Sequence, residues 1–223
     1  MHQRKGKKIL VYLFLLLIVG SINNTSLSKI QFEKIENITI SGLTENENIN
    51  LLENIEGQNL KNIFFLNGKE ISKIISSNNL VENYEIFKKY PHTIDIKIEK
   101  TKFLAKIKKN GKISLIGSNG KLSDIKFSDE ELPFIFGKPN INEFIKFTNV
   151  IEESKFSLNE IKNLYFFPSK RWDLEFKNNV ILKLSRDHTK LSLDQAFEIL
   201  NDNNFNDIKI VDARIKNQII LND

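Results

Sequence analysis

The sequence predicts an α+β fold with an N-terminal single transmembrane helix, a β-α-α-β-β module and a larger strand-rich module with flanking helices. Three local patterns support this prediction. Ile94, Ile96 and Ile98 alternate with polar residues, which is typical of a strand with one buried face. Asn110-Gly111 separates two apolar runs and is a strong hairpin signal. A third pattern, the helical spacing of apolar residues over 193–200, places a helix within the strand-rich part.

The N-terminal segment has the charge pattern of a membrane-targeting sequence. Four basic residues lie within the first eight positions, and an uncharged apolar run follows from Ile9 to Ile22. This pattern predicts a cytoplasmic N-terminus. The run of 14 residues spans only about 21 Å as a helix, against a hydrocarbon core of about 30 Å. Two interpretations therefore stay open: a signal peptide cleaved near Val19-Gly20-Ser21, or a retained anchor whose Lys7 and Lys8 extend toward the headgroups.

The first module, residues 35–99, is predicted as β-α-α-β-β. A strand ends at Ser41-Gly42, and Thr44 with Glu47 forms a capping box that begins a helix ended by Gly57. After the second helix the chain is extended up to Tyr90, and Pro91 turns it into the last strand. The apolar positions of the two helices and their connecting loop are Leu51, Leu52, Ile55, Leu60, Phe64, Phe65, Ile71, Ile74 and Ile75.

The second module, residues 103–223, is richer in strands. Its predicted strands cover 103–107, 113–116, 161–167, 172–176, 180–184, 208–211 and 215–221. Helices are predicted over 142–154 and around 193–200. Leu132-Pro133 and Asn178-Asn179 mark breaks between elements.

Charge and composition exclude several function classes. The chain has 223 residues and a net charge of +5, but the basic residues before Ile9 account for all but one unit of it. A nearly neutral body has no broad phosphate-binding surface. The absence of cysteine excludes disulfides and thiolate chemistry.

No familiar catalytic or metal-binding motif occurs, and we predict a non-catalytic protein without cofactor or metal. Asp187-His188 could orient an imidazole, but no nucleophile accompanies this pair. The adjacent carboxylates Glu130-Glu131 and Glu152-Glu153 point in different directions on any regular element, so solvated surfaces explain them better.

The C-terminal strand suggests a binding site for another chain. The sequence ends two residues after Leu221, and a last strand often lies at a sheet edge with unpaired backbone groups. The alternative is a closing strand that only completes the core, which pattern alone favours. Two interpretations of Arg171 are also possible: its guanidinium pairs with a carboxylate of this chain or with a carboxylate of a partner. If the edge is used, Asn217→Pro is expected to remove a backbone donor and block strand addition.

The order of elements resembles the bacterial cell-division family FtsQ, called DivIB in Gram-positive bacteria. The resemblance covers essentially the whole chain and rests on several short motifs in a characteristic order. They are Ile38-Thr-Ile-Ser-Gly42, Asn59-Leu60 with Phe64, Tyr90-Pro91 with Ile94-Asp-Ile-Lys-Ile-Glu99, Leu132-Pro133 with Gly137, Arg171-Trp172-Asp-Leu, Val180-Ile-Leu-Lys-Leu184 and Val211-Asp212-Ala-Arg214.

The resemblance implies a domain order and partners. Residues 1–8 would be a cytoplasmic tail, 9–28 an uncleaved anchor, 36–99 a POTRA domain and 100–223 the β domain. The β domain would pair its last strand with FtsB in complex with FtsL, through Ile215, Lys216, Asn217 and Gln218 together with Arg171. The chain would be a single-pass protein of the inner membrane, with its bulk in the periplasm and concentrated at the septum, where it helps recruit and regulate peptidoglycan synthesis.

Three alternatives remain at this point. One is another exported POTRA-containing binding or assembly protein, and a second is an exported cell-wall enzyme that would depend on His188 or Asp187. A third is a freely soluble periplasmic binding protein released by cleavage. Substrate turnover would identify the enzyme, and the mass of the mature N-terminus would identify the cleaved form.

Overall fold

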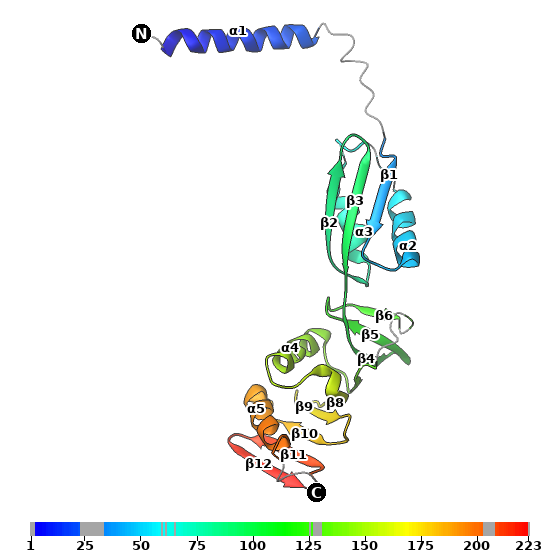
Figure 1. Cartoon of the computed structure of the whole chain (residues 1–223), viewed down its shortest axis with the longest axis vertical. Helices are drawn as coiled ribbons and strands as arrows, with labels where there is room; N and C mark the ends of the chain where they lie inside the picture. The colour runs from blue at the N-terminus through cyan, green and yellow to red at the C-terminus, as the bar shows by residue number, and fades with distance from the viewer. Residues whose placement is uncertain are drawn as a thin grey trace.

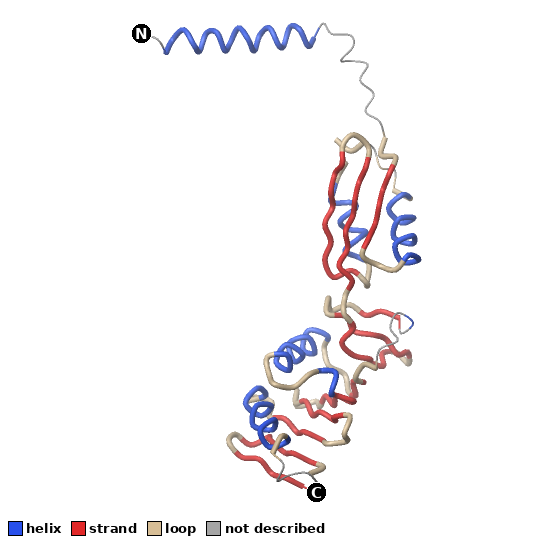
Figure 2. The backbone as a smooth tube through the Cα atoms, viewed as in Figure 1, coloured by secondary structure: helices blue, strands red, loops and turns tan. Residues whose placement is uncertain are grey.

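The computed structural model describes residues 3–22, 34–58, 60, 62–64, 66–124, 126, 131–202 and 208–222 (Figure 2). Residues 23–28 of the expected anchor, Asn59, Phe65 and Glu130 lie outside this part. The basic and apolar N-terminal sequence forms one continuous helix, α1 (Gln3–Ile22). In the described part of the chain, no helix combines the length and the apolar character that crossing a membrane requires.

The first module is a three-stranded sheet, counted over the described residues, with two helices beside it (Figure 1). The strand order is β1-β3-β2; β1 runs parallel to β3, and β2 runs antiparallel to it. The elements are β1 (Asn37–Ser41), α2 (Glu45–Glu56), α3 (Gly68–Ser77), β2 (Val81–Lys89) and β3 (Thr93–Lys100). The order of elements predicted from the sequence is therefore confirmed.

Local signals set the limits of these helices. Thr44 and Glu47 form the expected capping box at the start of α2, and Gly57 follows its last residue. Asn67 caps α3 by accepting a hydrogen bond from the Lys69 backbone N–H. The apolar faces of α2 and α3 then close over one face of the sheet. The fully buried side chains there are Leu51, Ile55, Ile63, Ile71, Ile75, Ile94 and Ile96.

The second module is a mixed sheet of nine described strands in the order β12-β11-β10-β9-β8-β7-β4-β5-β6. The strands are β4 (Phe103–Lys109), β5 (Lys112–Gly117), β6 (Leu122–Asp124), β7 (Phe134–Phe136), β8 (Ile161–Phe166), β9 (Trp172–Phe176), β10 (Ile181–Leu184), β11 (Ile210–Ile215) and β12 (Gln218–Asn222). The helices are α4 (Ile141–Glu152), a short 3-10 turn η2 (Leu158–Glu160) and α5 (Thr189–Leu200). Sequence analysis missed β6 and β7, which have three residues each.

Helices α4 and α5 cover one face of this sheet, and no helix of the described residues covers the other face (Figure 1). One row of apolar side chains crosses six strands on the covered face, as the strand registers require, and its last member on β12 is only partly buried. The row consists of Ile135, Leu164, Leu174, Leu182, Val211 and Leu221. Trp172 packs beneath α4, where its ring stacks on Phe147 at 4.6 Å between centroids. We call the opposite side of the sheet the open face.

A hydrogen-bonded junction joins the two modules. The turn between β5 and β6 reaches the end of α3, where Lys121 Nζ donates to the carbonyls of Ser76 (2.6 Å) and Asn78 (3.0 Å). A cation at this position also interacts favourably with the helix dipole. The Asn119 side-chain amide donates to the carbonyls of Asn79 and Val81, both at 2.9 Å. In these contacts, side chains of the second module donate hydrogen bonds to backbone carbonyls of the first module.

Candidate functional site

Strand β12 lies at one end of the nine-stranded sheet, and its register shows which backbone groups face outward. Gln218 is paired with Ile215 across the turn, and the Asn222 carbonyl accepts a hydrogen bond from Lys209 N at 3.0 Å. Residues 218, 220 and 222 therefore direct their backbone groups toward β11. Because this direction alternates along a strand, the N–H and C=O groups of Ile219 and Leu221 point away from the sheet. In the described structure, the outer edge of β12 is thus available for strand addition.

The opposite end of the sheet is different. Strand β6 has only three residues, and the Asn79 side-chain amide of the first module donates to the Leu122 carbonyl at 2.8 Å. A short and covered edge is a poor template for pairing. Of the two sheet ends, β12 is therefore the better candidate for binding a partner strand.

The four expected binding residues 215–218 form the connection between the last two strands. Ile215 ends β11 and does not begin the last strand, which corrects the expected span of 215–221. Asn217 has a φ of 59°, and the register shifts between Asp212 and Ile215. A bulge and a left-handed residue together close the turn. Proline cannot adopt this φ, so Asn217→Pro would disrupt the turn and is a poor test of the edge.

Arg171 lies at the same end of the strands as this turn. Its Nε donates to Asp173 Oδ1 (3.0 Å) and its second terminal nitrogen to Asp173 Oδ2 (3.2 Å). The guanidinium also lies 4.3 Å from the Phe167 ring centroid. Asp173 pairs in register with Lys183, and Lys183 pairs with Asp212 of β11, so one strand separates Arg171 from the hairpin. The internal ion pair holds the guanidinium in a fixed position.

A row of register-paired side chains on the open face connects Asp173, the partner of Arg171, with the edge strand. The three charged residues at its centre alternate in sign. Its members, in order across the strands, are Phe136, Tyr165, Asp173, Lys183, Asp212 and Ile220. Sequence analysis did not identify this row as a site. The signal was present in Val211-Asp212-Ala213-Arg214, because the period of two places both charged residues on one face of the strand.

The Asp212–Arg214 pair is the charged feature nearest the edge strand. Arg214 Nε donates to Asp212 Oδ1 at 2.8 Å. This bond lowers the pKa of Asp212 and raises the pKa of Arg214. Beside the pair, Ile215 is 55 % exposed and Ile220 is 47 % exposed. The edge therefore combines outward backbone groups, a fixed ion pair and exposed apolar side chains.

The middle of the open face contains a carboxylate with three hydrogen-bonded partners. Glu175 accepts bonds from Asn163 Nδ2 (2.9 Å) and the Tyr165 hydroxyl (2.6 Å), and Lys162 Nζ lies 3.0 Å away. These bonds, the one from Asn163 first, lower the pKa of Glu175 from 4.5 to about 2. The same carboxylate raises the pKa of Tyr165. These contacts join neighbouring strands and contribute to the stability of the sheet.

The Glu175 cluster predicts a specific pH dependence of stability. Since its pKa is lower in the folded than in the unfolded chain, its stabilisation is complete above about pH 4.5 and is lost as the pH falls toward 2. When the pH falls from 7 to 3, the Glu175→Gln protein is expected to lose less unfolding free energy than the unaltered protein. Denaturant unfolding of both proteins at the two pH values measures this difference. Equal pH dependence in both proteins would contradict the assignment.

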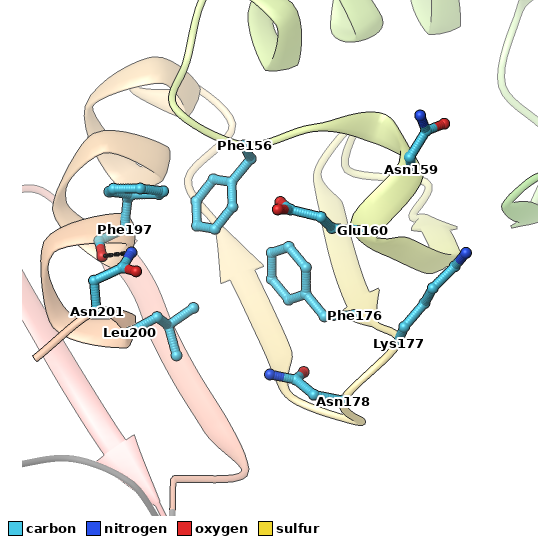
Figure 3. Close-up of a pocket in the computed structure, with 9 residues that line it drawn as sticks. All are labelled: Phe156, Asn159, Glu160, Phe176, Lys177, Asn178, Phe197, Leu200 and Asn201. Atoms are coloured by element: carbon cyan, nitrogen blue, oxygen red, sulfur yellow. Dashed lines mark hydrogen bonds between the residues drawn. The ribbon is translucent and has the colours of Figure 1, made fainter. Parts of the chain in front are cut away.

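A hollow near η2 and α5 has a volume of about 410 Å³ (Figure 3). Its inner wall is apolar, and its rim carries amides and two charged groups. The lining residues are Phe156, Asn159, Glu160, Phe176, Lys177, Asn178, Phe197, Leu200 and Asn201. Both charged groups already have partners: Glu160 accepts from Ser157 N (3.1 Å), and Lys177 Nζ donates to Glu131 (3.4 Å). The hollow therefore brings together an apolar surface and structural polar groups.

The two residues considered for catalysis, Asp187 and His188, lie at the start of a helix. His188 is the N-cap of α5, and Asp187 lies 3.8 Å from Arg186 Nε on the surface. Within the described residues, no group of three potential metal ligands occurs.

Comparisons with known proteins give matches over most of the chain. The family model "POTRA domain, FtsQ-type" matches residues 33–100, and the model "Cell division protein FtsQ/DivIB, C-terminal" matches residues 105–214. The chain is similar to the cell division protein FtsQ of Rickettsia typhi, with 23 % identity over 200 residues, covering 83 % of this chain and 71 % of that protein.

Two further matches are more limited. FtsQ of Rhizobium meliloti is 24 % identical over 154 residues, which cover 67 % of this chain and about half (49 %) of that protein. A solved structure of the major extracytoplasmic domain of DivIB from Geobacillus stearothermophilus aligns with a TM-score of 0.34 and 17 % identity. That alignment covers 47 % of this chain and 96 % of the solved chain.

Proposed function

This chain belongs to the FtsQ/DivIB family of bacterial cell-division proteins, and on that premise we propose that it is a non-catalytic, membrane-anchored scaffold of the divisome. It binds FtsB- and FtsL-type division proteins and helps to recruit and regulate septal peptidoglycan synthesis. The observation that supports binding most directly is the outward-facing backbone of Ile219 and Leu221 on β12.

The partner supplies a strand that pairs with β12 and extends the sheet. Ile215, Lys216, Asn217 and Gln218 form the turn beside that strand, and Ile220 offers an exposed apolar side chain to it. Arg171 is held at the same end of the sheet by Asp173. There it stabilises an acidic side chain of the incoming segment while it keeps its internal ion pair.

The N-terminal helix anchors the protein in the inner membrane. The domains of the proposal are a cytoplasmic tail (1–8), an anchor (9–28), a POTRA domain (36–99) and the β domain (100–223). The basic flank before Ile9 supports the orientation with the N-terminus inside. Because the apolar run is short, the anchor depends on Lys7 and Lys8 extending toward the headgroups. The folded bulk then lies in the periplasm and gathers at the septum.

Binding is favoured over catalysis because three carboxylates of the second module with lowered pKa values are engaged in structural contacts. Glu143 closes the capping box of α4, Glu175 joins neighbouring strands, and Asp212 is paired with Arg214. Each of these contacts fixes local geometry. Side chains used in this way keep the surface of the sheet in a defined shape for a partner.

The proposal is tested with a fluorescent protein fused to the N-terminus, in bacterial cells depleted of their own FtsQ-type protein. We expect a ring at midcell and restored division. The matched control carries Leu15→Lys and Leu16→Lys, which each cost about 2.5–3.5 kcal/mol at the centre of a spanning helix. This control should lose the ring. A uniform envelope signal from the unaltered chain would contradict the division role.

A further inference from the structure

The first module exposes two aromatic side chains at one end, which we call the aromatic tip: Phe64 and Tyr90. Phe64 is 53 % exposed and Tyr90 is 60 % exposed, and their ring centroids are 5.0 Å apart. Phe87, which is 41 % exposed, lies on strand β2, three residues before Tyr90 in the turn that follows this strand. Large aromatic groups at the surface are costly in water, so their grouping requires an explanation.

Exposed aromatic residues are concentrated at this end of the molecule. Among the described residues outside α1, one more aromatic side chain is comparably exposed, Phe136 of β7. Its ring stacks on Tyr165 at 5.1 Å within the open face of the second module. The aromatic tip therefore differs from the rest of the described surface.

Backbone and side-chain contacts fix the tip in place. Lys34 forms an isolated bridge with Asn62, and Lys88 Nζ donates to the Ile63 carbonyl at 3.2 Å. Ile63 is fully buried, so it secures the loop that presents Phe64. On the other side, the His92 carbonyl accepts from Glu36 N at 3.0 Å and holds the turn after Tyr90. The two rings are thus presented on a defined surface.

The position of the tip along the chain indicates what it contacts. The bridge at Lys34 shows that the chain enters the first module at the tip, and residues 23–33 alone separate this module from α1. Eleven residues reach at most about 40 Å, so the tip stays close to any surface that holds α1. Lys88 and Lys89 directly precede Tyr90, and Lys89 Nζ forms an ion pair with Asp95 at 2.8 Å. Farther from the tip, Lys97 Nζ lies 5.3 Å from the centroid of the Phe87 ring.

We propose that the aromatic tip docks on the surface of the bilayer that holds α1, with the rings of Phe64 and Tyr90 at the level of the headgroups. An aromatic body with a polar end is suited to this interface, where tyrosine side chains are enriched. This inference rests on the membrane attachment in the proposed function and adds a second contact to it.

Docking of the tip would set the orientation of both modules relative to the membrane. The turn between β2 and β3 and the strand β12 lie at opposite ends of the two modules (Figure 1). The junction at Asn119 and Lys121 connects these modules by hydrogen bonds. A tip held at the membrane would therefore keep the β12 edge away from it, where a partner strand approaches freely.

The experiment uses the full chain in vesicles of phosphatidylethanolamine and phosphatidylglycerol that carry bromine on their acyl chains. Phe64→Trp places an indole at the tip, and the unaltered protein gives the baseline of its buried Trp172. We expect the bromine to quench the added tryptophan. Phe136→Trp, at a similarly exposed position of the second module, should not be quenched. Adding Tyr90→Ser to Phe64→Trp should reduce the quenching.

Co-flotation of the chain with the vesicles separates the two levels of the proposal. A chain that floats but leaves the tryptophan at position 64 unquenched would overturn tip docking and leave the anchor intact. A chain that fails to float would overturn the anchor and, with it, the docking. Equal quenching in the Phe64→Trp and Phe136→Trp proteins would also overturn the inference, since contact would not be specific to the tip.

Discussion

Ile219→Pro is expected to lower the recovery of FtsB- and FtsL-type partners at least about tenfold, because one lost hydrogen bond and a proline ring at the paired edge together cost more than 1.4 kcal/mol. The Ile219 N–H points away from β11, so the sheet itself does not need this donor. Pull-down with the full chain measures the effect. The fold should persist, since proline is tolerated at an edge strand.

Two variants separate the backbone effect from other losses. Ile219→Ala removes the side chain, which packs against the core, but keeps the outward N–H, so it should retain most partner binding. Ile220→Pro removes an N–H that faces β11 and should lower the unfolding free energy. Equal partner recovery by Ile219→Pro and Ile219→Ala would mean that partners bind elsewhere on the protein.

Gly42→Ala is expected to destabilise the first module by about 2–5 kcal/mol, the sum of backbone strain and overlap. Gly42 has a φ of 110°, and an added Cβ would lie 1.8 Å from the Ile98 carbonyl oxygen. The chain comes this close to β3 just after β1 ends. Ile98 belongs to the core of the first module, so the strand cannot move aside without losing buried contacts. Denaturant unfolding measures the change.

Gly111→Ala is the matched control for this prediction. Gly111 also has a positive φ, 81°, but an added Cβ there meets no atom within 4 Å. Its substitution should cost only the backbone strain, about 1–2 kcal/mol. If both substitutions destabilised the protein equally, the close approach to Ile98 would not be the reason for glycine at position 42.

Sequence patterns predicted the helices and most strands because their signals are local. The capping box at Thr44, the apolar spacing over 193–200 and the Asn110-Gly111 turn each depend on residues within a few positions of one another. Strands β6 and β7 were missed for the same reason. Three residues are too few to show alternation, and β7 exists because it fits between β4 and β8.

The candidate site was predicted only in outline. Resemblance to the family pointed to Arg171 and residues 215–218, and whether they contact a partner stays a prediction. The division between strand and turn near Ile215 depends on a bulge and on the left-handed conformation of Asn217, which the apolar run Ile219-Ile220-Leu221 does not reveal. The charged row from Asp173 to Asp212 combines residues from three strands.

The sequence by itself determined the helices, most of the strands, their order and the family, since capping residues, periodicity and short motifs depend on residues that are close together in the chain. Only the tertiary structure decided which strand is left at an edge, which of its N–H groups point outward and which aromatic side chains meet at the tip. These properties depend on strand order and register, and such pairing joins residues that are far apart in the sequence.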